Sequence, residues 1–424
     1  MLTMLGSIWY KVLLITLVAQ LSLYFNDLYE SERSASYIDL AARLIQAIGI
    51  TSIALAIIYI LWPDMIIGRW IFFVSLVFLL LFLVSWRILY AIAISKKLFA
   101  ERAIMIGSDE LARDIMKQIE IRKDLSYNIS SIIAQNHRPS VDEKLHGIPL
   151  HVGFDHIFDV AVAENVKSII VALDEKRGIF PVDQLLKCKV QGINIIDGES
   201  FFERVTGKLL VERINPSWLI FSEGFAKSRT SRAVKRSVGF LVSAVSLVLL
   251  SPLLLIIAAA IKLDSSGPVL FSQERVGENG KAYTLYKFRS MIADAEKKSG
   301  PVWASEDDPR ITRVGRVIRK LRIDEFPQLW NVFKGDMSFV GPRPERPHFV
   351  QELQKKIPYY NERFSVKPGI TGWAQVKYSY GASEHDALEK LKYDLYYIKN
   401  MSLVIDLIVI FHTIKIVLLG RGSR

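Results

Sequence analysis

Two adjacent carboxylates, Asp324 and Glu325, follow the most basic stretch of the chain. Residues 308–322 hold six basic side chains in fifteen positions. Arginine forks match the oxygens of phosphate groups, although such a stretch could also be a solvated face or one that faces anionic lipid. A carboxylate among arginines can accept a phosphoryl group, and a second carboxylate can hold a divalent metal. The alternative is an ordinary capping Asp beside an exposed Glu.

The residues around this pair predict how it is presented. Asp324 is typical of a helix N-cap and Pro327 is tolerated only in a first turn, so we expect a helix to start here. A carboxylate at that end stays ionised, and a phosphate there would meet free N–H groups. Further along, two prolines bracket Arg343 and stiffen the backbone that would present it to an anion. The turn-rich segment 367–375 is a second functional candidate.

The apolar residues show where the membrane would lie. A helix needs about 20 apolar residues to cross a bilayer, and we predict a membrane region at 1–98. Its expected helices are 9–25, which is marginal, 37–62 and 70–94. Lys96, Lys97 and Arg102 follow the last of them, which places the soluble part on the cytoplasmic side by the positive-inside rule.

A fourth apolar run, 238–261, is long enough to cross but contains Ser251 and Pro252 near its middle. Proline removes a backbone hydrogen bond and kinks a helix. Basic residues flank both ends, which favours a re-entrant helix that dips into one leaflet and returns. A plain span is the alternative, and it would put the flanking domains in different compartments. The C-terminal run 401–419 carries three polar side chains and is expected to be an interfacial helix.

Residues 101–226 predict a soluble α/β domain. Strands alternate with helical patterns, which indicates a parallel sheet of Rossmann type. The expected strands are 103–106, 168–173 and 193–196. The loop after the first strand begins with Gly107 but lacks the other glycines of a dinucleotide fingerprint. Asp109 puts a carboxylate where a pyrophosphate would approach, so a structural or regulatory role is favoured over cofactor binding.

The composition excludes several classes of protein. Hydrophobic residues make up 51% and the formal net charge is +11, which suits an anionic membrane surface or phosphate ligands. Charged residues still make up 23%, too many for a transporter built mostly of lipid-facing helices. The single cysteine, Cys188, excludes an internal disulfide framework and a Cys-rich metal site.

The C-terminal motifs resemble those of the large monotopic phosphoglycosyl transferases, the bacterial polyprenyl-phosphate hexose-1-phosphate transferases. The resemblance lies in an expected catalytic domain at 232–424. It rests on Ser251-Pro252, 273–277, 287–291, Asp324-Glu325, 341–344 and 369–373, in that order. The middle domain and the segment 346–349 resemble the exopolysaccharide subgroup associated with PEP-CTERM sorting systems.

The resemblance implies a fold and a reaction. The fold class is α/β with membrane helices, in which a re-entrant helix leads into a mostly helical catalytic domain. The enzyme would transfer hexose-1-phosphate from a UDP-sugar, by default UDP-glucose, to undecaprenyl phosphate and release UMP. This step would initiate exopolysaccharide assembly at the bacterial inner membrane. Larger family members carry four N-terminal spans where this chain shows three, which would put its N-terminus outside.

The resemblance also implies residue roles. Asp324 would form a covalent aspartyl-phosphosugar, and Glu325 would position Mg²⁺. The candidates for phosphate or nucleotide contact are Lys287, Arg289, Arg310, Arg319 and Arg343. The expected partners are the donor, the lipid acceptor, membrane lipid and a second copy of the chain, with no nucleic acid.

Two other functions compete with this one. The first is a membrane-tethered nucleotide-sugar sensor or scaffold without turnover, against which the intact carboxylate pair argues. The second is a Rossmann oxidoreductase or epimerase, against which the incomplete glycine loop argues.

Overall fold

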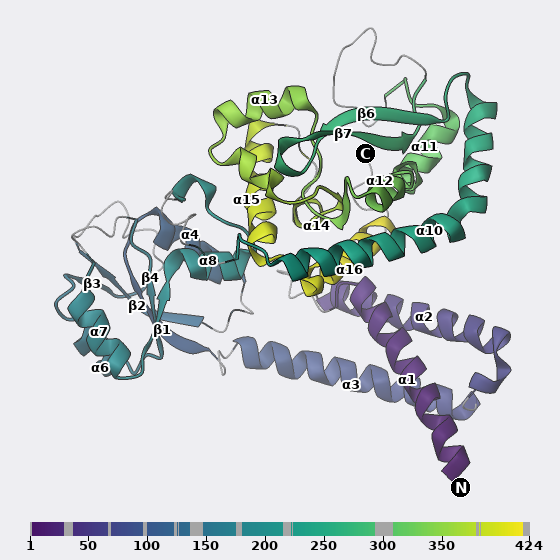
Figure 1. Cartoon of the computed structure of the whole chain (residues 1–424). Coiled ribbons are helices and arrows are strands. Elements are labelled where there is room, and N and C mark those ends of the chain that lie inside the picture. The colour runs from purple at the N-terminus through teal and green to yellow at the C-terminus, as the bar shows by residue number, and fades with distance from the viewer. Residues whose placement is uncertain are drawn as a thin grey trace. The chain divides into compact units, whose positions relative to one another are not determined.

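The computed structural model divides into two compact units, residues 1–205 and 206–424 (Figure 1). The described residues are 2–28, 37–66, 69–95, 100–122, 125, 127–135, 147–174, 180–214, 222, 224–292, 308–378, 381 and 383–418. Lys96 and Lys97, on which the predicted orientation depends, lie outside them, as does residue 419 at the end of the predicted C-terminal helix.

The first unit begins with apolar helices. They are α1 (Leu2–Phe25), α2 (Tyr37–Leu61) and α3 (Arg69–Ser95), with a 3-10 turn η1 (Pro63–Met65) before α3. Within α2 and α3, the segments Asp39–Leu61 and Val77–Ile94 are long and apolar enough to cross a membrane, whereas Trp9–Phe25 is shorter. Ser22 on α1 donates its hydroxyl to the Ala47 carbonyl on α2 over 2.6 Å, so this buried polar group is satisfied between the helices.

A five-stranded parallel sheet follows, in the order β3-β2-β1-β4-β5, which confirms the predicted Rossmann-type sheet. Its strands are β1 (Glu101–Ile106), β2 (Tyr127–Ala134), β3 (Leu150–Val152), β4 (Ser168–Val171) and β5 (Asn194–Asp197). The helices between and after them are α4 (Glu110–Ile121), α6 (Ile157–Ala163), α7 (Val182–Val190) and α8 (Gly198–Thr206).

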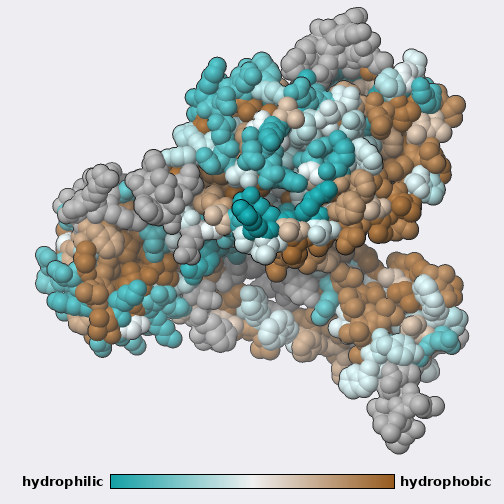
Figure 2. All heavy atoms as spheres, viewed as in Figure 1, coloured by the Kyte–Doolittle hydropathy of each residue, from teal (hydrophilic) through white to brown (hydrophobic). Residues whose placement is uncertain are grey.

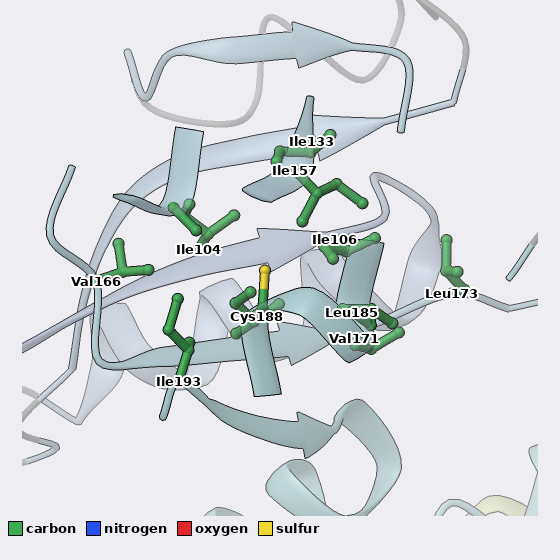
Figure 3. Close-up of a cluster of buried hydrophobic side chains, with 12 residues drawn as sticks. Ile104, Ile106, Ile133, Ile157, Val166, Val171, Leu173, Leu185, Cys188 and Ile193 are labelled. Carbon is green, nitrogen blue, oxygen red and sulfur yellow. The ribbon is translucent and has the colours of Figure 1, made fainter. Parts of the chain in front are cut away.

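The sheet is built around an apolar core (Figure 3). Ile104 and Ile106 of β1 pack with Ile157 of α6 and with Cys188 of α7, and all four side chains are fully buried. Burial raises the pKa of the Cys188 thiol, so this cysteine serves as a small apolar core residue.

The loop after β1 is shaped by packing. Gly107 has a φ of 111°, and a Cβ there would lie 2.2 Å from the Ala172 carbonyl oxygen, so only glycine fits. At the start of α4, Asp174 accepts the Leu111 amide over 3.4 Å. With Asp109 at the N-cap, two carboxylates lie where a pyrophosphate would bind, which favours the structural interpretation.

The second unit is mostly helical. Its helices are α10 (Arg229–Asp264), α11 (Arg313–Lys320), α12 (Gln328–Lys334), α13 (Pro347–Lys356), α14 (Trp373–Lys377), α15 (Glu384–Asn400) and α16 (Leu403–Leu418). The hairpin β6 (Leu270–Val276) and β7 (Ala282–Phe288) is antiparallel, whereas β8 (Ser338–Val340) and β9 (Gly369–Thr371) are parallel. The 3-10 turns are η2 (Val211–Arg213), η3 (Glu278–Gly280), η4 (Ile323–Glu325) and η5 (Tyr360–Ser365).

The boundary between the units lies earlier than the predicted residue 226. Leu209 and Val211 are buried in the core of the second unit. The Trp373 indole donates to the Gly207 carbonyl over 2.8 Å, and Lys208 pairs with Glu389 at 3.0 Å. The segment after α8 therefore packs as part of the second unit.

The apolar helix α10 is held by the second unit at both ends. Near its start, Lys235 pairs with Asp406 of α16 at 2.8 Å, and Arg236 donates to two carbonyls at the end of α12. At its end, Asp264 accepts the Val314 amide of α11 over 3.0 Å. Pro252 lies inside the helix, and Figure 1 shows a sharp turn between its two halves.

Many apolar side chains of α10 and α16 are exposed. Most of the apolar residues of α10 are exposed, and Figure 2 shows a hydrophobic surface over this helix. On α16, Asp406 and Lys415 are buried whereas Phe411 is exposed. Two of the three polar residues that suggested an interfacial helix, Asp406 and Lys415, therefore face the protein, while exposed apolar residues of the helix form a surface that suits a non-aqueous environment.

Candidate active site

The carboxylate pair lies in the 3-10 turn η4 between α11 and α12. Arg322, just before it, adopts a left-handed conformation with a φ of 58°, which reverses the chain after α11. The predicted helix start at Asp324 is wrong, because α12 begins at Gln328 with Pro327 as its N-cap. The Phe326 amide bonds to the Ile323 carbonyl, which closes a separate turn before the helix. Asp324 therefore caps no helix.

Glu325 is the buried member of the pair, 9% exposed. Its Oε1 accepts from Lys287 Nζ at 2.9 Å and from Arg343 Nη2 at 3.1 Å, and Arg322 Nη1 lies at 4.0 Å. Burial by itself would raise the pKa of Glu325, but the positive charges of Lys287 and Arg343 outweigh it and hold the pKa well below its usual range. Glu325 is therefore ionised, with Lys287, Arg343 and Arg322 within 4.0 Å of its Oε1.

Asp324 is partly buried beside this cluster. Burial raises the pKa of its carboxyl group, Lys287 opposes the shift, and the neighbouring charge of Glu325 adds to it. Arg322 and Arg319 oppose it more weakly. The prediction that a helix dipole keeps Asp324 ionised is replaced by a balance between burial and nearby cations.

The hairpin strand β7 positions Lys287 opposite η4. Asn331 of α12, fully buried, fastens the helix to this strand. Its Oδ1 accepts the Tyr286 amide over 3.2 Å, and its Nδ2 donates to the Thr284 carbonyl over 2.7 Å. The role of Asn331 was not predicted from the sequence, where its signal is a polar side chain between the apolar residues Trp330 and Val332.

The loop after β8 brings Arg343 to the pair. The Gly341 amide bonds to the Thr371 carbonyl over 2.9 Å, which ties the loop to the turn-rich segment that begins at residue 367. A Cβ on Gly341 would lie 2.4 Å from the Lys367 carbonyl oxygen, so the two loops meet backbone to backbone. The second predicted loop therefore supports the loop that carries Arg343.

The other predicted cations have different partners. Arg289 is buried and donates to the carbonyls of Ser265 and Ser266 at the end of α10, over 2.8 and 2.9 Å. Arg310 pairs with Asp308 two residues away. Of the five candidates, Lys287 and Arg343 contact Glu325, and the charge of Arg319 acts on Asp324.

The predicted kink residues lie on the exposed surface of α10. The Ser251 hydroxyl donates to the Val248 carbonyl over 2.7 Å, one turn earlier. Pro252 follows it inside the helix, where no amide is available to continue the ladder.

A metal at this site would need ligands from the substrate. Among the described residues, no group of three or more His, Cys, Asp and Glu side chains gathers. The pair Asp324 and Glu325 offers the hard oxygen donors that Mg²⁺ prefers. Since Mg²⁺ usually takes one or two carboxylates together with phosphate oxygens and water, the pair fits such an ion once a diphosphate is bound.

Comparison with known proteins connects this arrangement to a family. Residues 230–420 match the model of the bacterial sugar transferases, and residues 24–196 match that of a CoA-binding domain. The chain is 42% identical over 240 residues to an Aeromonas hydrophila UDP-N-acetylgalactosamine-undecaprenyl-phosphate N-acetylgalactosaminephosphotransferase, covering 57% of this chain and 56% of that protein.

Two further relatives extend the comparison. A UDP-glucose:undecaprenyl-phosphate glucose-1-phosphate transferase of Escherichia coli is 41% identical over 191 residues, which are 44% of this chain and 40% of that protein. The exopolysaccharide production protein PSS of Rhizobium leguminosarum bv. phaseoli is 42% identical over 189 residues, which are 43% of this chain and 93% of that protein.

The chain spans about half the length of the Aeromonas relative, but it covers nearly all of the shorter Rhizobium protein. The matched region contains α10, the carboxylate pair and the Arg343 loop. The chain therefore belongs to the bacterial sugar transferase family.

Proposed function

We propose that this protein transfers a hexose-1-phosphate from a UDP-sugar to undecaprenyl phosphate and releases UMP. This transfer would initiate exopolysaccharide assembly. The observation that carries the proposal is the placement of Asp324 beside Glu325, whose Oε1 contacts Lys287 and Arg343 at 2.9 and 3.1 Å. Asp324 is partly buried and its pKa is raised, which suits a nucleophile. Glu325 contacts cations that could stabilise the charge of a bound diphosphate.

The reaction has two displacements at phosphorus. A carboxylate oxygen of Asp324 attacks the β-phosphorus of the donor, the bond to the bridging oxygen breaks, and UMP leaves with the electron pair. The acceptor's phosphate oxygen then attacks the same phosphorus and displaces the aspartate. Lys287 and Arg343 stabilise the negative charge that builds up in each step.

Mg²⁺ is part of the proposal. Glu325 would hold it together with oxygens of the bound diphosphate and water. When bound, the ion would neutralise charge on the diphosphate. Because Lys287 and Arg343 already contact Oε1 of Glu325, they would keep this carboxylate ionised and oriented before the donor arrives.

The shape of α10 supports a re-entrant helix over a plain span. Its first turns are fastened to α12 and α16, and its last residue is fastened to α11. All three partners belong to one compact unit. A helix whose two ends contact the same polar unit enters and leaves the bilayer on one side, because a crossing would separate those contacts by about 30 Å.

This arrangement accounts for the choice of acceptor. The phosphate of a polyprenyl lipid lies at the membrane interface, and α10 would hold the carboxylate pair at that height. We accordingly propose a multi-pass protein of the bacterial inner membrane with its catalytic unit on the cytoplasmic face. A homodimer also remains part of the proposal.

The sugar is proposed to be glucose, with an N-acetylated hexose or galactose as alternatives. The names of the relatives support both kinds, since one is a glucose-1-phosphate transferase and another an N-acetylgalactosaminephosphotransferase.

The test is UMP release by the purified full-length protein with undecaprenyl phosphate, Mg²⁺ and a panel of UDP-sugars. We expect release with one donor, its loss with EDTA, and its loss in Asp324→Asn. Without acceptor, a donor radiolabelled in its sugar should leave label on the peptide containing Asp324. The control is Asp336→Asn, which alters an aspartate of the same unit that pairs with Lys334 at 2.8 Å. Folded protein that releases no UMP with any donor contradicts the proposal and favours a scaffold.

A further inference from the structure

The loop that carries Arg343 is held in an unusual way. The four successive carbonyls of residues 342–345 each accept a hydrogen bond from elsewhere in the unit. In chain order, the donors are the Gly369 amide, Arg363 Nη2, Arg275 Nη1 and the Val276 amide, each at 3.0 Å. Two residues of the loop are prolines and have no amide to donate, so the backbone is fixed through its carbonyls.

Two of these four donors are side chains. Arg363 of η5 is 6% exposed and reaches the carbonyl of Arg343 itself. Its other contacts are Asp394 Oδ2 of α15, at 2.8 Å, and the Tyr360 hydroxyl, at 2.6 Å. Arg275 of β6 reaches the next carbonyl in the same manner. The backbone of the residue that contacts Glu325 is thus held by a buried guanidinium.

Stability alone does not explain this network. Burying an ion pair costs desolvation free energy, and well-packed apolar residues often replace such pairs without loss. Arg363 and Arg275 also each bury an Nε with no hydrogen-bond partner, which is a further cost. The planar guanidinium of Arg363 donates to both Asp394 and the Arg343 carbonyl and so holds them in a fixed geometry. An apolar side chain could not do this.

We infer that Arg363, anchored by Asp394, is a positioning residue for the transfer reaction: it fixes the backbone from which Arg343 reaches Glu325. Arg275 performs the same task on the following carbonyl. The inference rests on the proposed function, because it gives Arg343 a fixed place beside the reacting diphosphate. Neither Arg363 nor Asp394 touches the carboxylate pair in the structure, so both act through Arg343.

The first test is Arg363→Lys in the full-length protein. Lysine keeps the charge beside Asp394 but lacks the planar fork. We expect kcat for UMP release to fall by about tenfold or more, while KM for the UDP-sugar changes by less than about threefold, because the donor still binds but the charge that develops in the transition state is less well met. An unchanged kcat overturns the inference.

A matched pair of variants separates positioning from folding. Asp394 and Glu389 are both buried carboxylates of α15, paired at 2.8 Å with Arg363 and at 2.6 Å with Lys392. Asp394→Asn and Glu389→Gln should both lower the thermal unfolding midpoint. Only Asp394→Asn should lower kcat, since Glu389 lies outside the network that reaches Arg343. An equal loss of kcat in both variants contradicts a positioning role.

A double-mutant cycle gives the sharpest kinetic readout. In an Arg343→Ala background there is no guanidinium left to position. Arg363→Lys should then lower kcat by less than about a further twofold. If Arg363→Lys costs the same factor in both backgrounds, it acts by another route and the inference fails.

Hydrogen exchange keeps the inference testable without turnover. Amide exchange in the peptide covering 338–350 should be faster in Arg363→Lys than in wild type, and unchanged in Glu389→Gln. If wild-type protein releases no UMP, the proposed function fails, and exchange alone decides whether Arg363 holds the loop. Unchanged exchange in Arg363→Lys means that it does not.

Discussion

The two units differ in what surrounds their central elements. The core of the parallel sheet around Ile106 and Cys188 is apolar. In the second unit, charged side chains are buried beside or near the candidate site, among them Glu325, Arg363 and Asp394. Each unit places carboxylates beside a loop. In the second unit, Lys287 and Arg343 contact Glu325, whereas in the first unit Asp174 accepts the Leu111 amide. The surroundings of a carboxylate therefore say more about its chemistry than its presence does.

The largest expected effect comes from comparing Asp324 with Asp109, the N-cap aspartate of α4. Asp324→Asn removes the proposed nucleophile, and kcat for UMP release should fall by about a thousandfold or more. Asp109→Asn should leave kcat within about twofold. Steady-state UMP release measures both. Comparable losses in the two variants would erase the distinction between the units.

The next effect concerns Glu325. Glu325→Gln removes the anion that Lys287 and Arg343 share, and it takes away the charge that balances these two partly buried cations. We expect kcat to fall by about a hundredfold and stability by about 3 kcal/mol, because breaking a buried pair from one side is costly. Calorimetry and kinetics on the same preparation test this. Full stability with full activity would show that Glu325 does not organise the site.

The pH dependence tests the balance at Asp324. The transfer needs this carboxylate ionised, and burial raises its pKa above its ordinary value of about 3.9. Activity should therefore fall, by about tenfold per pH unit, as the pH drops below a midpoint that lies above that of an ordinary aspartate. Glu325 adds nothing in this range, because its pKa is shifted downward. Measuring kcat/KM from about pH 4 to 8 should show this acidic fall. A profile that stays flat down to about pH 4 would contradict the raised pKa of Asp324.

The smallest effect is expected in the first unit. Gly107→Ala places a methyl group 2.2 Å from the Ala172 carbonyl oxygen at a φ of 111°, and should destabilise the sheet by about 2 kcal/mol. Because this loop holds no reacting group, kcat should stay within about twofold in the protein that remains folded. Thermal unfolding measures the loss of stability, and UMP release by the folded protein measures kcat. A selective loss of kcat would give the loop a role that its carboxylates argue against.

The strands β1, β4 and β5 could be predicted from the sequence, whereas β2 and β3 could not. β1, β4 and β5 follow from apolar runs, but β2 contains Ser130 and Ser131, which look like turn residues. Their hydroxyls donate to Glu164 in the fold, so polar groups are satisfied inside the sheet. β3 has only three residues, too few for a pattern.

At the site, the sequence pointed to the carboxylate pair as a hypothesis but could not choose among the cations. Lys287 and Arg289 are two residues apart on one motif, yet the first contacts Glu325 and the second fastens the end of α10. That division depends on carbonyls of a turn more than twenty residues earlier, which no local spacing encodes. Arg363 escaped notice for the same reason, because its partners come from three separate segments.

The two-ended attachment of α10 also sets an order of events during synthesis. The partners at its C-terminal end, in β7 and α11, follow within about sixty residues, so that end can be fastened while the rest of the chain is still being made. The start of α10 is fastened later and in two steps. Arg236 bonds to carbonyls of α12 that are made 96 and 97 residues after it. Lys235 pairs with Asp406, which is made 171 residues after it. The contact between α10 and α16 is therefore the last of these attachments to become available.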